Sequence, residues 1–228
     1  MIKIFAVNPF RQVCYIVSDD SSKKCVIIDC GATEQFEFDR ITDYISKNEL
    51  TPIMALNTHA HIDHILGINK IKELYNIPFA VSSLDTPTLS AAPISAKMYG
   101  LVTGEFEIPT IDIDIKDMEE IEIGDTKLKI IPTPGHTSGG VTFYLEDEGA
   151  IFTGDTLFKG SIGRTDLPTG DYNELMHSII NNLLPLAIEK DIVVYPGHGN
   201  HTTIGEEVAT NPFVNEVLND KVNPKMDY

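Results

Sequence analysis

The chain has few cysteines, and their spacing excludes two kinds of protein. Its three cysteines, Cys14, Cys25 and Cys30, form no Cys-x-x-Cys pair. That pattern argues against a disulfide scaffold and against a structural zinc site closed by thiolates. An odd number of thiols without framework spacing fits a reducing compartment, so we expect a cytoplasmic protein.

Basic side chains and long apolar runs are also scarce. Seventeen Lys and Arg residues stand against 34 Asp and Glu residues, which gives a formal net charge of −17. Such a surface repels phosphate backbones, so we expect no nucleic-acid partner. No apolar run approaches the length of a membrane span, and residues 1–7 resemble an opening strand rather than a secretory signal. We therefore expect no membrane partner and a single domain over residues 1–228.

Histidine, by contrast, is concentrated. The segment from Thr58 to His64 reads Thr-His-Ala-His-Ile-Asp-His, and two Pro-Gly-His turns and a Gly-Asp pair follow later in the chain. Imidazole and carboxylate ligands suit zinc and other first-row divalent ions. Seven ligands are too many for one four-coordinate ion but fit two ions if one carboxylate bridges them. The candidates are His59, His61, Asp63, His64, His136, Asp155 and His198.

The remaining histidines, His177 and His201, stand in ordinary surroundings, and we expect no role for them. His177 lies off the apolar stripe of a helix that is predicted to begin at Asp171, with Glu174 in the capping-box position.

The order of predicted elements places the ligand candidates together. Helices are also predicted from Glu34 and over residues 68–75, and the predicted strands cover residues 13–17, 25–29, 53–56, 79–81, 126–131, 141–145, 150–152 and 192–195. Leu56, Ile131, Phe152 and Tyr195 each end an apolar strand, and a ligand candidate follows each within a few residues. We expect these strand ends to meet at one rim.

Residues 83–118 are the least regular part of the sequence. Pro87, Pro93, Gly100 and Pro109 interrupt them, and residues 111–115 alternate like an edge strand. We interpret this stretch, with weak regular structure, as a lid or a binding loop.

Taken together, these motifs resemble the metallo-β-lactamase-fold hydrolases, and within them the short bacterial glyoxalase II-like (hydroxyacylglutathione hydrolase-like) group. The resemblance runs almost end to end. It is carried by residues 14–17, 29–32, 58–64, 134–137, 154–158 and 196–199, and more specifically by residues 160–166, 202–206 and 211–213. It implies an α/β fold: a four-layer αβ/βα sandwich of two mixed β-sheets with outer helices and the metals at one edge.

The same resemblance implies a role for each ligand candidate. The first metal would take His59, His61 and His136, and the second Asp63, His64 and His198, with Asp155 as the bridge. Asp63 would also have a catalytic role in orienting the attacking hydroxide. We expect two divalent ions, most plausibly zinc, with iron or manganese as alternatives.

The expected activity is metal-dependent hydrolysis of thioesters of the S-2-hydroxyacylglutathione type, or of related small esters, by a hydroxide held between the ions. Arg164 stands where glyoxalase II-like enzymes place a basic residue near the thiol carrier, although a surface ion pair explains it equally well. Full-length glyoxalase II holds glutathione through a basic helical extension, whereas the segment after His198 is largely acidic or neutral here. We therefore expect weak recognition of glutathione.

Other activities stay open at this point. Mononuclear iron persulfide dioxygenases resemble the chain through the same Gly-Arg-Thr-Asp segment, residues 163–166, and they would use oxygen instead of water. A lactonase or another hydrolase of this fold is a further alternative. β-Lactamase activity is less expected, because the best-known zinc β-lactamases carry Cys where this chain has Asp155.

Overall fold

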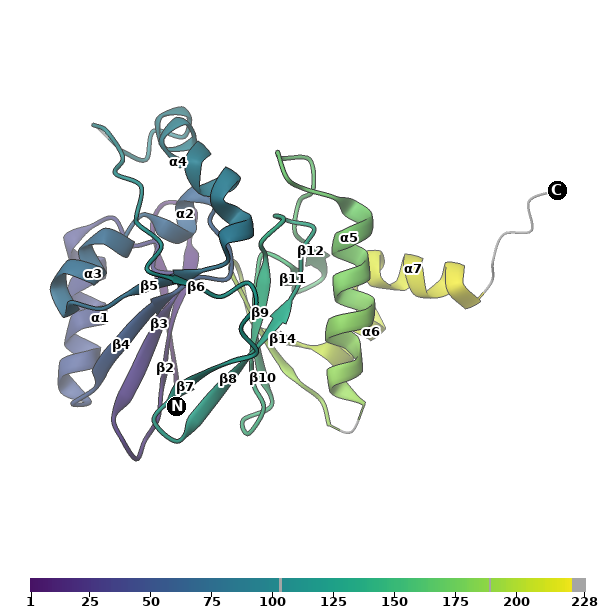
Figure 1. Ribbon diagram of the computed structural model, residues 1–228. Helices are drawn as coiled ribbons and strands as arrows, with labels where there is room; N and C mark the ends of the chain where they lie inside the picture. Colours follow the sequence, from purple (N-terminus) through teal and green to yellow (C-terminus); the bar gives the residue numbers. More distant parts are fainter. Residues whose placement is uncertain (103, 189, 223–228) are drawn as a thin grey trace.

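Two six-stranded sheets face each other, and helices cover the outer face of each (Figure 1). The computed structural model describes residues 1–102, 104–188 and 190–222. The four-layer sandwich that the sequence predicts is confirmed. Among the described residues, none of the helices combines the length and the apolar character that a membrane span requires.

The first sheet has the strand order β1-β2-β3-β4-β5-β6. Its first three strands are antiparallel, and the following pairs are parallel. The strands are β1 (Ile2–Val7), β2 (Gln12–Ser18), β3 (Lys24–Ile28), β4 (Thr51–Leu56), β5 (Phe79–Val81) and β6 (Ile113–Asp114). The prediction of an edge strand near residue 113 is confirmed, because β6 pairs only with β5 in this order.

The second sheet has the order β14-β13-β10-β9-β8-β7, with β10 and β13 parallel. Its strands are β7 (Glu120–Ile123), β8 (Thr126–Pro132), β9 (Val141–Leu145), β10 (Ala150–Gly154), β13 (Val193–Pro196) and β14 (Thr202–Thr203). A small ribbon of β11 (Leu157–Phe158) and β12 (Ser161–Ile162) follows β10.

Three apolar layers hold the sandwich together. Between the sheets lie fully buried side chains such as Leu56, Phe143 and Phe152. Helices α1 (Gln35–Lys47), α2 (Ile62–Ile65), α3 (Ile68–Tyr75) and α4 (Thr86–Met98) pack outside the first sheet. Helices α5 (Tyr172–His177), α6 (Ile204–Thr210) and α7 (Pro212–Val222) lie outside the second (Figure 1). Helix α1 buries Phe38, Ile41 and Ile45, the residues whose spacing predicts it.

The helix expected from Asp171 is capped by the Asp171 carboxylate as predicted, but the Asp171 N–H donates to the Gly135 carbonyl rather than to Glu174, and the segment is not one regular α-helix. The Asp171 carboxylate accepts a hydrogen bond from the Glu174 backbone N–H at 2.9 Å. After α5 the chain forms a π-helical segment, η2 (Ser178–Leu183), and then a 3₁₀ segment, η3 (Leu184–Ala187). Pro185 has no N–H to continue an α-helical ladder, which explains the change of winding near it.

The expectation of weak regular structure over residues 83–118 is wrong for its first half. A short 3₁₀ turn, η1 (Ser83–Asp85), leads into the 13-residue helix α4. Pro87 occupies the first turn of α4, where its missing N–H leaves no intrahelical bond unmade. Pro87 therefore stands where a helix accepts it, whereas Pro93 lies inside the helix.

Candidate metal centre

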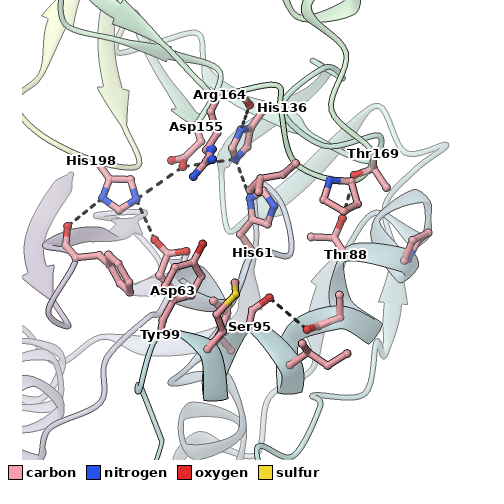
Figure 2. Close-up of a pocket in the computed structure, with 18 residues that line it drawn as sticks. His61, Asp63, Thr88, Ser95, Tyr99, His136, Asp155, Arg164, Thr169 and His198 are labelled. Atoms are coloured by element: carbon pink, nitrogen blue, oxygen red, sulfur yellow. Dashed lines mark hydrogen bonds and ion pairs between the residues drawn. The ribbon is translucent and has the colours of Figure 1, made fainter.

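All seven predicted ligands come together at the ends of strands on one rim of the sandwich (Figure 2 labels five of them). His59 and His61 follow β4, and His136 follows β8. Asp155 follows β10, and His198 follows β13. Asp63 and His64 lie in α2, the short helix that begins directly after His61. The rim predicted from the sequence is confirmed.

The ligand candidates form two groups of three. The first group contains His59, His61 and His136, and the second contains Asp63, His64 and His198; a third set of close ligand atoms, Asp29, His59 and His64, shares one histidine with each. Within each group the ligand atoms lie within 4.8 Å of one another. These are the two sets that the sequence resemblance implies.

Asp155 lies between the two groups. Its Oδ2 is 3.6 Å from Nε2 of His136 in the first group and 3.7 Å from Nε2 of His198 in the second. Its Oδ1 is 3.3 Å from Nε2 of His64. One carboxylate therefore reaches both groups, which is the position a bridging ligand requires.

Glycine makes this close approach possible. A Cβ at Gly197 would lie 2.2 Å from Asp155 Oδ1 and 2.7 Å from His64 Cε1. Gly135, with φ of +125°, lies against the backbone of Leu175, where a Cβ would meet the Leu175 nitrogen at 2.1 Å. The glycine in each Pro-Gly-His turn is therefore required by space.

Several polar atoms at this centre have no partner within the described chain. Nε2 of His59, Nε2 of His64 and Oδ1 of Asp155 are buried without a hydrogen bond. Buried polar atoms are normally paired, and an unpaired one costs about 1–3 kcal/mol. His61 Nδ1 and His136 Nε2 also face each other at 2.8 Å. Nitrogen and oxygen atoms that converge without partners fit divalent cations, which would satisfy them together.

Hydrogen bonds on the outer side of the rings set the histidine tautomers. The backbone carbonyl of Arg164 accepts from Nδ1 of His136 at 2.7 Å, and that of Phe10 accepts from Nδ1 of His198 at 3.2 Å. A carbonyl can only accept, so each Nδ1 carries the proton and each Nε2 offers a lone pair to the centre.

The electrostatics of the site also favour a bound cation. Burial and the neighbouring His64 hold the pKa of His59 well below its usual range, and burial lowers the pKa of His61 to about 4. Both rings are therefore neutral at pH 7, as metal ligands must be. Burial opposes a charge on His64, yet Asp155, Asp63 and Asp29 raise its pKa well above normal. These carboxylates therefore favour a positive charge at this buried position.

Asp29 supports the centre from behind, a role that sequence reasoning missed. Its carboxylate accepts from the backbone N–H and the hydroxyl of Thr58, both at 2.7 Å, and its Oδ2 is 3.1 Å from Nδ1 of His64. The Thr58 hydroxyl has donated its proton to Asp29, so it accepts from Nδ1 of His59 at 3.0 Å. Asp29 therefore orients the His59 ring of the first group through Thr58, and its carboxylate lies within ion-pair distance of His64 in the second group.

Asp85 is a second support that the sequence did not indicate. Its buried carboxylate accepts from the backbone N–H groups of Ala60 and Gly139 at 2.8 and 2.7 Å, and from the Thr137 hydroxyl at 3.0 Å. It ties the loop that carries His59 and His61 to the loop that carries His136. Neither aspartate stands in a histidine cluster; the signals for Asp29 are its place at the end of a strand and in the segment 29–32 that shares in the family resemblance.

The centre forms the floor of a cleft of about 500 Å³ (Figure 2). Helix α4 makes one wall. Arg164 lines the cleft and is also exposed, and its guanidinium forms a two-point ion pair with Asp166 at 2.7 and 2.8 Å. Arg164 is therefore both a cleft residue and a member of a surface ion pair. His177 and His201 are exposed and stand outside both ligand groups.

Comparison with known proteins supports this geometry. Residues 7–198 match the model of a family described as the metallo-beta-lactamase superfamily. The chain belongs to this superfamily. Its members are mostly hydrolases, and they use a site for two metal ions.

Relatives within the metallo-beta-lactamase superfamily carry different names. The hydroxyacylglutathione hydrolase GloC of Haemophilus influenzae is 35% identical, over 94% of this chain and 98% of the relative. The structure of the BLEG-1 B3 metallo-beta-lactamase superposes with a TM-score of 0.83 at 32% identity, covering 94% and 99% of the two chains. The structure of TTHA1623 in a di-iron-bound form superposes with a TM-score of 0.79 at 31% identity, and the match covers 92% of this chain and 99% of that one.

The support by Asp29 leads to a first prediction. Replacing Asp29→Ala should weaken metal binding by about 10–100-fold, because ligand rings that lose an outer partner lose their orientation. Competition with a chromophoric chelator measures this affinity. Asp166→Ala, an exposed aspartate outside both ligand groups, is the control and should bind metal like the wild type. Equal affinity in the two variants would contradict the role of Asp29.

The position of Asp155 leads to a second prediction. Asp155→Ala should lower metal content and turnover together, because it removes the carboxylate that reaches both groups. His177→Ala, which changes an exposed histidine, should alter neither. Elemental analysis of the purified variants measures metal content, and similar values for both would show that the ligand assignment is wrong.

Proposed function

We propose that the protein is a binuclear zinc metallohydrolase that cleaves thioesters of the S-2-hydroxyacylglutathione type or related small esters. One observation carries the proposal: two groups of three ligand atoms lie on either side of one carboxylate, and His61, Asp63, His136, Asp155 and His198 line an open cleft. His59, His61 and His136 would hold one ion, Asp63, His64 and His198 the other, and Asp155 would touch both.

When bound, two divalent ions make a water nucleophilic near neutral pH and polarise the carbonyl that it attacks. Asp63 lines the cleft with its Oδ2 at 3.0 Å from Nε2 of His198. From that place its carboxylate can accept a hydrogen bond from the attacking water and orient it, which is the catalytic role we assign to Asp63. The pKa of Asp63 is lowered, mainly by His64 and His198 against the effect of burial, so the carboxylate is ionised at neutral pH.

The chemistry of the leaving group favours a thioester. A thiolate, with a pKa of about 8.5, leaves without a strong general acid, whereas an amide nitrogen requires a proton. The similarity to a relative named hydroxyacylglutathione hydrolase supports the same substrate class. Arg164, on the cleft, is the candidate for contact with a substrate carboxylate, because its fork matches carboxylate geometry.

The third prediction concerns this arginine. Because Arg164 is exposed and already paired with Asp166, its contribution to binding should be small. Arg164→Ala should raise the KM for S-lactoylglutathione by no more than about tenfold and leave kcat nearly unchanged. Asp166→Ala, which frees the guanidinium, should leave KM equal or lower. Steady-state kinetics of the three proteins measure these effects.

A panel of substrates tests the reaction class itself. The wild type should hydrolyse S-lactoylglutathione detectably, with a high KM. If the protein turned over a cephalosporin or a lactone rapidly and did not hydrolyse thioesters, the proposal would be overturned. Oxygen consumption with glutathione persulfide, without hydrolysis, would assign the protein to the dioxygenase alternative.

A further inference from the structure

Helix α4 carries apolar side chains on two faces. Leu89, Ala92 and Ala96 are buried against the first sheet's outer core. Ile94 and Met98, four residues apart, line the cleft and are 73% and 69% exposed. Large apolar side chains held in water at the edge of a site indicate a surface that binds an apolar ligand.

The apolar surface continues across the cleft and reaches the ligand groups. Tyr99, directly after α4, contacts Phe10 edge to face, with ring centroids 5.6 Å apart. The Phe10 carbonyl is the group that accepts from Nδ1 of His198. A substrate carbonyl at the metal centre would therefore have the Phe10 and Tyr99 rings, Ile94 and Met98 within the same cleft (Figure 2 labels Tyr99 and His198).

The cleft offers little to a charged substituent. Apart from the ligand groups, Arg164 is the one charged side chain among the described residues that line it, and Asp166 already pairs with it. The Ser95 hydroxyl donates to the Ala91 carbonyl of its own helix at 3.3 Å. The hydroxyls of Thr88 and Thr169 lie 3.3 Å apart and bond to each other. The serine and threonine hydroxyls of the wall are therefore engaged with the protein itself.

We propose that Ile94, Met98, Tyr99 and Phe10 bind an uncharged hydrocarbon substituent next to the scissile carbonyl, and that this surface sets the substrate preference. The inference rests on the proposed function and deepens it: the preferred substrates are thioesters or esters with an apolar group, and charged glutathione adds little. Each methylene that moves from water onto such a surface contributes to binding in proportion to the area it buries.

Two series of thioesters test the inference on metal-loaded protein. The first varies the acyl chain from acetyl through butyryl to hexanoyl on N-acetylcysteamine, an uncharged thiol. The second keeps the acetyl group and lengthens an alkanethiol leaving group. We expect kcat/KM to rise about two- to fourfold per methylene in at least one series. The series in which it rises tells which side of the carbonyl the apolar surface binds.

Two isoleucines provide matched variants. Ile94→Ser should reduce the increase in kcat/KM to about 1.5-fold per methylene or less, because it removes apolar area from the cleft. Ile188→Ser changes an isoleucine that is 82% exposed and lies outside the cleft, and it should keep the wild-type slope. Both side chains are exposed, so neither change disturbs the core.

The outcomes separate the two proposals. The inferred role of the apolar surface would be overturned if thioesters were hydrolysed at rates that do not depend on chain length. It would also be overturned if Ile94→Ser left the dependence of kcat/KM on chain length unchanged. Either result would leave the proposed function standing. No hydrolysis of any thioester by protein that binds two ions would overturn the proposed function and the inference together. A preference for acyl-glutathione over the same acyl group on N-acetylcysteamine by more than about tenfold would also contradict the inference, because one ion pair at Arg164 does not account for it.

Discussion

The structure depends on a concentration of nitrogen and oxygen lone pairs at one edge of a β-sandwich. Asp155 is within 3.3–3.7 Å of histidines in both ligand groups, and buried atoms of His59 and His64 have no partner within the described chain. Such an arrangement is unfavourable by itself, because buried polar atoms cost free energy when unpaired. The surrounding structure holds these atoms in place. The candidate ligands lie at strand ends, Gly135 and Gly197 leave room for them to come close together, and Asp29 and Asp85 fix the loops.

The unpaired polar atoms lie at the rim of the sandwich, whereas apolar layers stabilise the fold. Apolar side chains between the sheets and under the helices form buried layers, and Ala60 and Ile62, which stand among the ligand candidates, join one of these layers. The rim can therefore carry neutral imidazoles, ionised carboxylates and exposed apolar side chains without weakening the core. Helix α4 links the two parts, since one face packs on the first sheet and the other lines the cleft.

Sequence reasoning predicted the parts of this design that have local signatures. The histidine clusters identified all seven candidates, and the apolar strands that precede them identified the rim. Asp29 and Asp85 were missed because their partners, Thr58 and the residues around Gly139, are about 30 and more than 50 positions away in the chain. Helix α4 was missed because apolar residues on two faces blur the helical period, and because Pro87 and Pro93 look like breaks. The change of winding near Pro185 does have a local signal, because Pro185 has no N–H for an α-helical hydrogen bond.

The central claim is that two cations, not one, complete the site. The direct test is elemental analysis of the wild-type protein after removal of metal by a chelator, reconstitution with zinc, iron or manganese, and removal of the excess. The structure predicts close to two ions per chain with the metal that the protein prefers. A content of at most one ion with every metal, under conditions in which the protein remains folded, would contradict the binuclear assignment and favour a mononuclear enzyme.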